Sequence, residues 1–131
     1  MACSDNVVRA GLTPKFKDVE TLCSMLDYAP GSVDRFRMSW TAVDEYSDQC
    51  LPPVPDFAMA RVRLPTSVDG YALARRSSAS ILVVLQGRPR IAGVGEFGYG
   101  QILFLNAGQQ LTLDARHSTD DVIIYQAFSN V

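Results

Sequence analysis

Short apolar runs separated by glycines dominate the second half of the chain. Between Ala58 and Leu64, small or aliphatic residues alternate with Met or Arg, which is the period-two pattern of a half-solvated strand. The continuous apolar run from Ser80 to Gln86 predicts a strand buried on both faces. Further strand candidates are 71–74, 88–92, 101–105, 109–114 and 122–128. About seven short strands with turn glycines between them predict a β-sandwich or barrel over residues 57–131.

The first 28 residues have a helical period instead. Asp18 is a good N-cap, and apolar residues recur after it at i, i+3, i+4 and i+7. We expect this stripe to pack on a neighbouring layer. Its members are Val19, Leu22, Cys23 and Leu26. Residues 6–10 predict a short strand ahead of the helix, so residues 1–28 form a strand–helix segment.

Residues 29–56 show no sustained period and are rich in Ser and Asp, with three prolines near the end. Such a stretch predicts a long linker between the two ordered parts. Trp40 lies within it, and a lone Trp in this setting is more typical of a packing anchor than of a ligand platform. The chain therefore divides into the segment 1–28, the linker 29–56 and a β-domain at 57–131.

Composition narrows the class of protein. A chain of 131 residues, 47% hydrophobic and 20% charged, is typical of a soluble globular domain. The net charge of −2 provides no basic footprint for nucleic acid. The longest aliphatic run, Ile81–Leu85, is too short to cross a membrane, and the first ten residues lack the features of a signal peptide. Three widely spaced cysteines, an odd number, indicate reduced thiols and a cytoplasmic setting.

Candidate metal and nucleophilic chemistry is limited by the presence of a single histidine, His117. A zinc site needs three or four His, Cys or carboxylate ligands, and no local cluster of the sequence offers that set. No Gly-x-Ser-x-Gly elbow accompanies the histidine either. We therefore expect no bound metal in this chain, and we interpret His117 as a surface residue.

The stretch from Gly100 to Gly108 has the spacing of a glycine, five residues, a turn residue and a second glycine. It resembles the second motif of the cupin jelly roll, with Asn106 where a proline is usual. In metal-binding cupins a histidine follows three positions after the last glycine, and here that position is Leu111. The resemblance implies a mainly β, cupin-like jelly-roll sandwich whose role is structural or regulatory.

A second and more specific resemblance covers the block SDNVVRAGLTPKF at residues 4–16. This block is similar to the signature of the type I mannose-6-phosphate isomerases (phosphomannose isomerases). The similarity continues through Asp18-Val19 and the following helix to Tyr28, and it returns in PPVPDF at residues 52–57. A thirteen-residue block of mixed polar and apolar identity is far more specific than a glycine pattern.

That resemblance implies an activity. Members of the family interconvert mannose 6-phosphate and fructose 6-phosphate with one zinc ion, through a cis-enediol, and so supply the precursor of GDP-mannose. Arg9 aligns with the catalytic arginine, whose fixed charge suits a developing enediolate. Lys15 aligns with a lysine placed toward the substrate phosphate, and Asp5 with an active-site aspartate. From the residues alone, Arg9 and Asp5 would instead be an exposed ion pair worth little.

The chain also departs from the family. The zinc ligands of the family are a Gln, a Glu and two His, all N-terminal to the part that matches residues 1–16. The resemblance therefore implies the C-terminal part of a zinc-dependent cytoplasmic isomerase, with zinc in the full-length family and none expected on this chain. We expect the isolated chain to be inactive. Exposed apolar surface on residues 1–16 could drive self-association.

An alternative from another class is a stand-alone, non-metal cupin-like binding or interaction module. Its arginine-rich strands would hold an acidic small molecule, although these arginines also suit the solvated faces of strands, the interpretation we favour. The residues are Arg61, Arg63, Arg75, Arg76, Arg88 and Arg90. A metal cupin enzyme is disfavoured by Leu111 and the single histidine.

Overall fold

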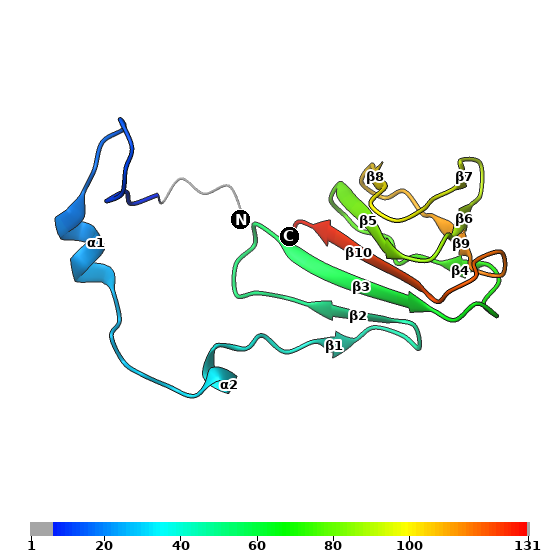
Figure 1. Ribbon diagram of the computed structural model, residues 1–131, viewed down its shortest axis with the longest axis horizontal. Helices are drawn as coiled ribbons and strands as arrows, with labels where there is room; N and C mark the ends of the chain where they lie inside the picture. Colours follow the sequence, from blue (N-terminus) through cyan, green and yellow to red (C-terminus); the bar gives the residue numbers. More distant parts are fainter. Residues whose placement is uncertain (1–6, 131) are drawn as a thin grey trace. The chain divides into compact units, whose positions relative to one another are not determined.

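The computed structural model describes residues 7–130, which fall into two compact units divided between Arg37 and Met38. Figure 1 shows the helices of the first unit and the strands of the second. The first unit contains α1 (Val19–Met25) and the single turn α2 (Val33–Phe36). Each unit is described on its own below.

In the first unit, the predicted cap of α1 is confirmed. Asp18 Oδ1 accepts a hydrogen bond from the Thr21 backbone N–H at 2.9 Å, which satisfies a donor that the first turn leaves free. The predicted strand is wrong for residues 7–10, which have no regular secondary structure. The stripe of α1 is also not packed as expected, since none of the helix is buried and only Leu22 is half-buried.

The second unit is a sandwich of two antiparallel sheets. One sheet has the order β1-β2-β3-β10-β5-β8 and the other β4-β9-β6-β7 (Figure 1). The last eight strands have jelly-roll connectivity, which confirms the expected mainly β, cupin-like class. They are β3 (Ala58–Leu64), β4 (Tyr71–Ala72), β5 (Ser80–Gln86), β6 (Arg90–Ile91), β7 (Gly95–Glu96), β8 (Ile102–Leu105), β9 (Thr112–Asp114) and β10 (Val122–Phe128).

Two strands lie inside the stretch 29–56 that the sequence predicts as a linker. They are β1 (Thr41–Ala42) and β2 (Ser47–Cys50), and β2 pairs with β3. The linker prediction is therefore wrong for these residues. The strand β2 reads SDQC and carries no apolar stripe, so its place in the sheet depends on backbone pairing and on an ion pair between Asp48 and Arg61.

The core lies between the two sheets. Alternate residues of β3 point inward and are almost completely buried, as the period-two pattern predicts. The Leu111 side chain, 6% exposed, belongs to this core together with Leu113 and Leu73. The cupin position that holds a metal ligand elsewhere is thus filled by a packed leucine in this chain.

One prediction about the sheet is wrong. The run from Ser80 to Gln86 was expected to be buried on both faces, but Ile81 is 50% exposed and Leu85 is 45% exposed on β5. Each sheet of a sandwich places only one face on the core, so alternate residues of a continuous apolar run remain on the outer face. Ile102 and Phe104 on the neighbouring β8 extend this exposed apolar surface.

Candidate functional site

The residues predicted to act on the substrate lie in the first unit. The Arg9 carbonyl accepts a hydrogen bond from the Asp18 backbone N–H at 2.8 Å, which ties the Arg9 backbone to the start of α1. The Lys15 N–H donates to Thr13 Oγ1 at 3.2 Å, and the Lys15 side chain is exposed. Asp5 lies outside the described residues 7–130.

Within the described part of the chain, the side chains of Arg9 and Lys15 have no ion-pair partner and are not bonded to each other. Arg9 is half-buried. Two cations without an ion-pair partner among residues 7–130 can attract an anionic ligand. Their roles remain a prediction from the sequence.

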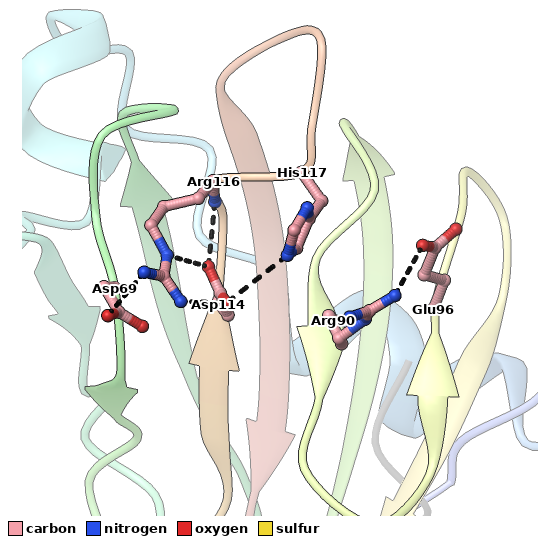
Figure 2. Close-up of polar contacts among 6 residues, drawn as sticks. All are labelled: Asp69, Arg90, Glu96, Asp114, Arg116 and His117. Carbon is pink, nitrogen blue, oxygen red and sulfur yellow. Dashed lines mark hydrogen bonds and ion pairs between the residues drawn. The ribbon is translucent and has the colours of Figure 1, made fainter.

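A second polar cluster lies at one end of the sandwich, between the loop that follows β9 and the loop that precedes β4 (Figure 2). Asp114 accepts hydrogen bonds from Arg116 Nε at 3.1 Å and Nη2 at 2.9 Å, and Arg116 Nη1 lies 2.9 Å from Asp69 Oδ2. These hydrogen bonds from Arg116 lower the pKa of Asp114 to about 2. The arginine therefore links two loops through two carboxylates.

His117 belongs to the same cluster but shows no sign of catalytic use. Its Nε2 lies 4.0 Å from Asp114 Oδ2, beyond hydrogen-bond distance, and the side chain is 50% exposed. The neighbouring hydroxyl of Ser118 donates to the Asp120 carbonyl and accepts from the Arg88 backbone N–H. That hydroxyl is engaged in holding the loop, so the Asp–His pair has no activated serine beside it.

The strand arginines on the outer face of the six-stranded sheet are paired. Arg61 binds Asp48 in a two-point ion pair, and its guanidinium lies 4.7 Å above the Trp40 ring. The Trp40 and Tyr125 rings pack edge to face with their centroids 6.1 Å apart, so Trp40 acts as the packing anchor that the sequence predicts. Arg63 also reaches Asp48, at 3.2 Å. The hydrogen bond to Asp48 raises the pKa of Arg61, and this single carboxylate offsets part of the positive charge of the two arginines.

Among residues 7–130, no group of three or more His, Cys, Asp and Glu is placed to hold a metal ion. A zinc site of the kind that the resemblance implies does not fit the residues that the structure describes. The same part of the chain contains no helix long and apolar enough to span a bilayer. The predicted site residues that the structure describes are the cations Arg9 and Lys15.

The sequence analysis missed Gln126, one of the few polar residues in the interior. It is 1% exposed and lies in β10 between the buried Ile124 and Phe128. Its Oε1 is 3.4 Å from Arg76 Nε, and its Nε2 donates to Ser80 Oγ at 2.9 Å. The available signal was a glutamine at an inward position of an alternating apolar strand, because a buried amide needs partners.

By topology, the second unit defines a cupin-like jelly-roll domain without a metal centre among its described residues. No protein-family model matches the chain. The chain is 46% identical to rat mannose-6-phosphate isomerase over 120 residues, covering 86% of this chain and 28% of the relative. It is 42% identical to the human protein of that name over 134 residues, covering 97% and 31%. Mannose-6-phosphate isomerase 1 of Arabidopsis thaliana is 36% identical, covering 99% and 29%.

Solved structures show the same fold. A mutant phosphomannose isomerase from Salmonella typhimurium superposes with a TM-score of 0.75 at 22% identity, covering 98% of this chain and 32% of that one. A second structure of the Salmonella enzyme, bound to fructose 6-phosphate and zinc, has a TM-score of 0.59 and covers 97% and 31%. The chain belongs to the mannose-6-phosphate isomerase family, and it corresponds to the C-terminal portion of its members. It spans 28–31% of the length of the relatives named above.

Proposed function

We propose that this chain is the C-terminal part of a zinc-dependent aldose–ketose isomerase that interconverts mannose 6-phosphate and fructose 6-phosphate. The observation that carries the proposal is an identity of 42–46% to the rat and human isomerases over 86–97% of the chain. The setting is cytoplasmic, and the product supports GDP-mannose synthesis. In this proposal zinc is bound by sequence outside residues 7–130, and the isolated chain is inactive; the lack of a group of three or more His, Cys, Asp and Glu placed for a metal among residues 7–130 supports it.

The proposed roles follow the chemistry of the side chains. The Arg9 guanidinium stabilises the negative charge that develops on the substrate oxygens during proton transfer between neighbouring carbons. Its backbone bond to Asp18 at the start of α1 supports a fixed position for this cation. Lys15, exposed and flexible, binds the phosphate end of the sugar, and Asp5 orients one of the two cations.

The first test is the sequence of the native transcript upstream of the Met1 codon. An open frame that encodes a Gln, a Glu and two His in zinc-ligand spacing supports the proposal. An in-frame stop directly upstream contradicts it and favours a stand-alone module. In parallel, the purified 131-residue chain is assayed with mannose 6-phosphate and added zinc, and measurable isomerisation would show that the chain is no fragment.

Arg9 is tested in a chimaera in which this chain replaces the matching portion of the human isomerase. We expect Arg9→Lys to lower kcat by about 100-fold, the scale of losing one donor to a developing oxyanion. Lys15→Ala should mainly raise KM for mannose 6-phosphate. The matched control is Arg35→Lys, since Arg35 is an exposed arginine paired with Asp27 in the same unit. Equal losses for Arg9→Lys and Arg35→Lys would remove Arg9 from the active site.

Self-association of the isolated chain is a further part of the proposal. Leu12 and Phe16 are exposed at 108% and 81%, and both lie in the segment that matches the isomerase signature. We expect a concentration-dependent increase in molar mass by light scattering. The double variant Leu12→Ser, Phe16→Ser should be a monomer, and a wild-type chain that is monomeric at every concentration would contradict this part.

A further inference from the structure

We infer that the jelly-roll unit has a binding site for a small oxyanion, a phosphate group or a phosphate monoester, built around Arg76. The residues that line this site all belong to the second unit, and the inference does not depend on the isomerase proposal. It lies at a cavity of about 260 Å³ where the end of β2, the β4–β5 loop and the end of β10 meet. Pockets for drug-sized ligands are about 300–1,000 Å³, so this volume suits a small anion or a small ester.

Arg76 is held in place by neutral groups. Its Nη1 donates to Gln49 Oε1 at 3.2 Å and its Nε to Gln126 Oε1 at 3.4 Å, while the guanidinium carbon lies 3.8 Å above the centre of the Phe128 ring. Gln126 is itself fixed by Ser80. The stacking and the two amides orient the guanidinium plane without neutralising its charge.

The charge around the cavity is uncompensated among the described residues. Within residues 7–130, no carboxylate lies within ion-pair distance of Arg76 or of its neighbour Arg75, and the described residues that line the cavity include no Asp or Glu. Arg75 also lines the cavity, and its Nε and Nη2 donate to Gln110 Oε1 at 3.2 and 3.1 Å. Two adjacent arginines therefore contribute positive charge to one hollow.

Among the described arginines of this unit, Arg75, Arg76 and Arg88 have no carboxylate within ion-pair distance in residues 7–130, and of these three only Arg76 is half-buried. Arg61, Arg90 and Arg116 each face a carboxylate. Burial lowers the pKa of Arg76, whereas the pKa of Arg61 is raised by its bond to Asp48. A half-buried guanidinium without a countercharge carries a desolvation cost, and an incoming oxyanion that accepts from its remaining N–H groups offsets that cost.

Of the five N–H donors of Arg76, the hydrogen bonds to Gln49 and Gln126 use two. The other three N–H groups lie on Nη1 and Nη2, and they are the donors that can bind the oxygens of a phosphate group. Asn130 also lines the cavity, but its Nδ2 donates to the carbonyls of Pro52 and Val54, so the donors for the anion come from the arginines. A phosphate bound by Arg76, with Arg75 adding long-range attraction, is the arrangement that these contacts support.

The test is a titration of the full 131-residue chain with inorganic phosphate and, separately, with mannose 6-phosphate, at constant ionic strength set with chloride. Binding is followed by calorimetry and by the NMR signal of the Arg76 Nε–H. We expect saturable binding that shifts this signal. Similar affinities for both probes indicate a phosphate site, and tighter binding of the sugar phosphate indicates a monoester site.

Substitutions of single arginines test whether the anion binds at Arg76. Arg76→Gln should weaken binding by about tenfold or more, Arg76→Lys less, because it keeps the charge and loses the two-pronged geometry. Arg75→Gln, at an exposed position that cannot disturb the core, should give a smaller loss. The matched control is Arg88→Gln, which removes one exposed arginine that does not line this cavity.

Two results overturn the inference. One is the absence of saturation by either probe at millimolar concentrations in the folded wild-type chain. The other is equal weakening by Arg88→Gln and Arg75→Gln, which shows a general charge effect. Arg9→Gln should leave the titration unchanged, so failure of this site and failure of the isomerase proposal give different results.

Discussion

Residues 7–37 and residues 38–130 use their apolar side chains in opposite ways. In the first unit no described residue is buried, and Leu12 and Phe16 lie open to solvent. In the second unit, apolar residues from both sheets form a main core, in which Leu64 and Leu113 have no exposed surface. One chain can therefore contain both a domain with its own hydrophobic core and a segment whose apolar side chains are not buried within that segment.

The two units also differ in how their order is maintained. The jelly roll connects residues far apart in the chain through strand pairing and inward packing. The first unit relies on contacts between near neighbours, such as the Asp18 cap of a seven-residue helix. A helix that short is marginal in water without a buried face. We therefore expect the first unit to open at a much lower free energy than the second.

The largest effect that tests this comparison is a cavity in the core. Leu113→Ala should lower the free energy of unfolding of the jelly roll by about 2–5 kcal/mol, because Leu113 is completely buried. The control Leu12→Ala, in the first unit, should change it by less than about 0.5 kcal/mol. Urea denaturation followed by tryptophan fluorescence measures both. Similar losses for the two variants would show that the first unit shares the core of the second.

The next largest difference in stability is expected between two glycine-to-alanine substitutions, one in each unit. Gly87 has φ +75°, and a Cβ added there would lie 2.8 Å from Ser118 Oγ and 2.9 Å from the Asp121 carbonyl oxygen. Gly87→Ala should therefore cost about 2–4 kcal/mol through strain and overpacking. Gly11 in the first unit has open space around it, so Gly11→Ala should leave the free energy of unfolding unchanged or slightly higher. Thermal unfolding of both variants tests the contrast.

The smallest effect concerns pH. The pKa of Asp114 is lowered from 3.8 to about 2 by Arg116, so its contribution to stability is present above pH 3.8 and is lost as the pH falls toward 2. Hydrogen bonds from Thr21 lower the pKa of Asp18 as well. In Arg116→Gln, the pKa of Asp114 should rise toward 3.8 while that of Asp18 stays unchanged. Carboxylate chemical shifts over a pH titration measure both, and a parallel rise would mean that the two regions are electrostatically linked.

Much of the fold could be predicted from the sequence. The strands Ala58–Leu64, Ser80–Gln86 and Val122–Phe128 match their predictions at both ends, because long alternating or continuous apolar runs are the most reliable strand signal. The short strands were overestimated by one to three residues or, like β7, missed. Two-residue strands carry too few side chains to show a period, and their pairing partners decide whether they form.

For the candidate sites, too, the sequence predicts some features and only the structure shows the others. The block at residues 4–16 identified the family and placed Arg9, Lys15 and Asp5 as candidates, whose roles stay predictions. The sequence also drew attention to the arginines of the β-domain, but it could not distinguish Arg61 from Arg76. Only the sheet register brings Asp48 opposite Arg61, and only the packing of β10 places Gln126 and Phe128 against Arg76.

By itself, the sequence determined that a β-sandwich follows a capped helix, that the chain carries an isomerase signature, and that a leucine replaces a metal ligand at position 111. These features are local, since they depend on the period and identity of neighbouring residues. The tertiary structure decided which strands adjoin, which apolar face of β5 remains exposed, and which arginines meet a carboxylate. Those outcomes depend on residues distant in the chain, and only the folded backbone brings such residues within a few ångströms of one another.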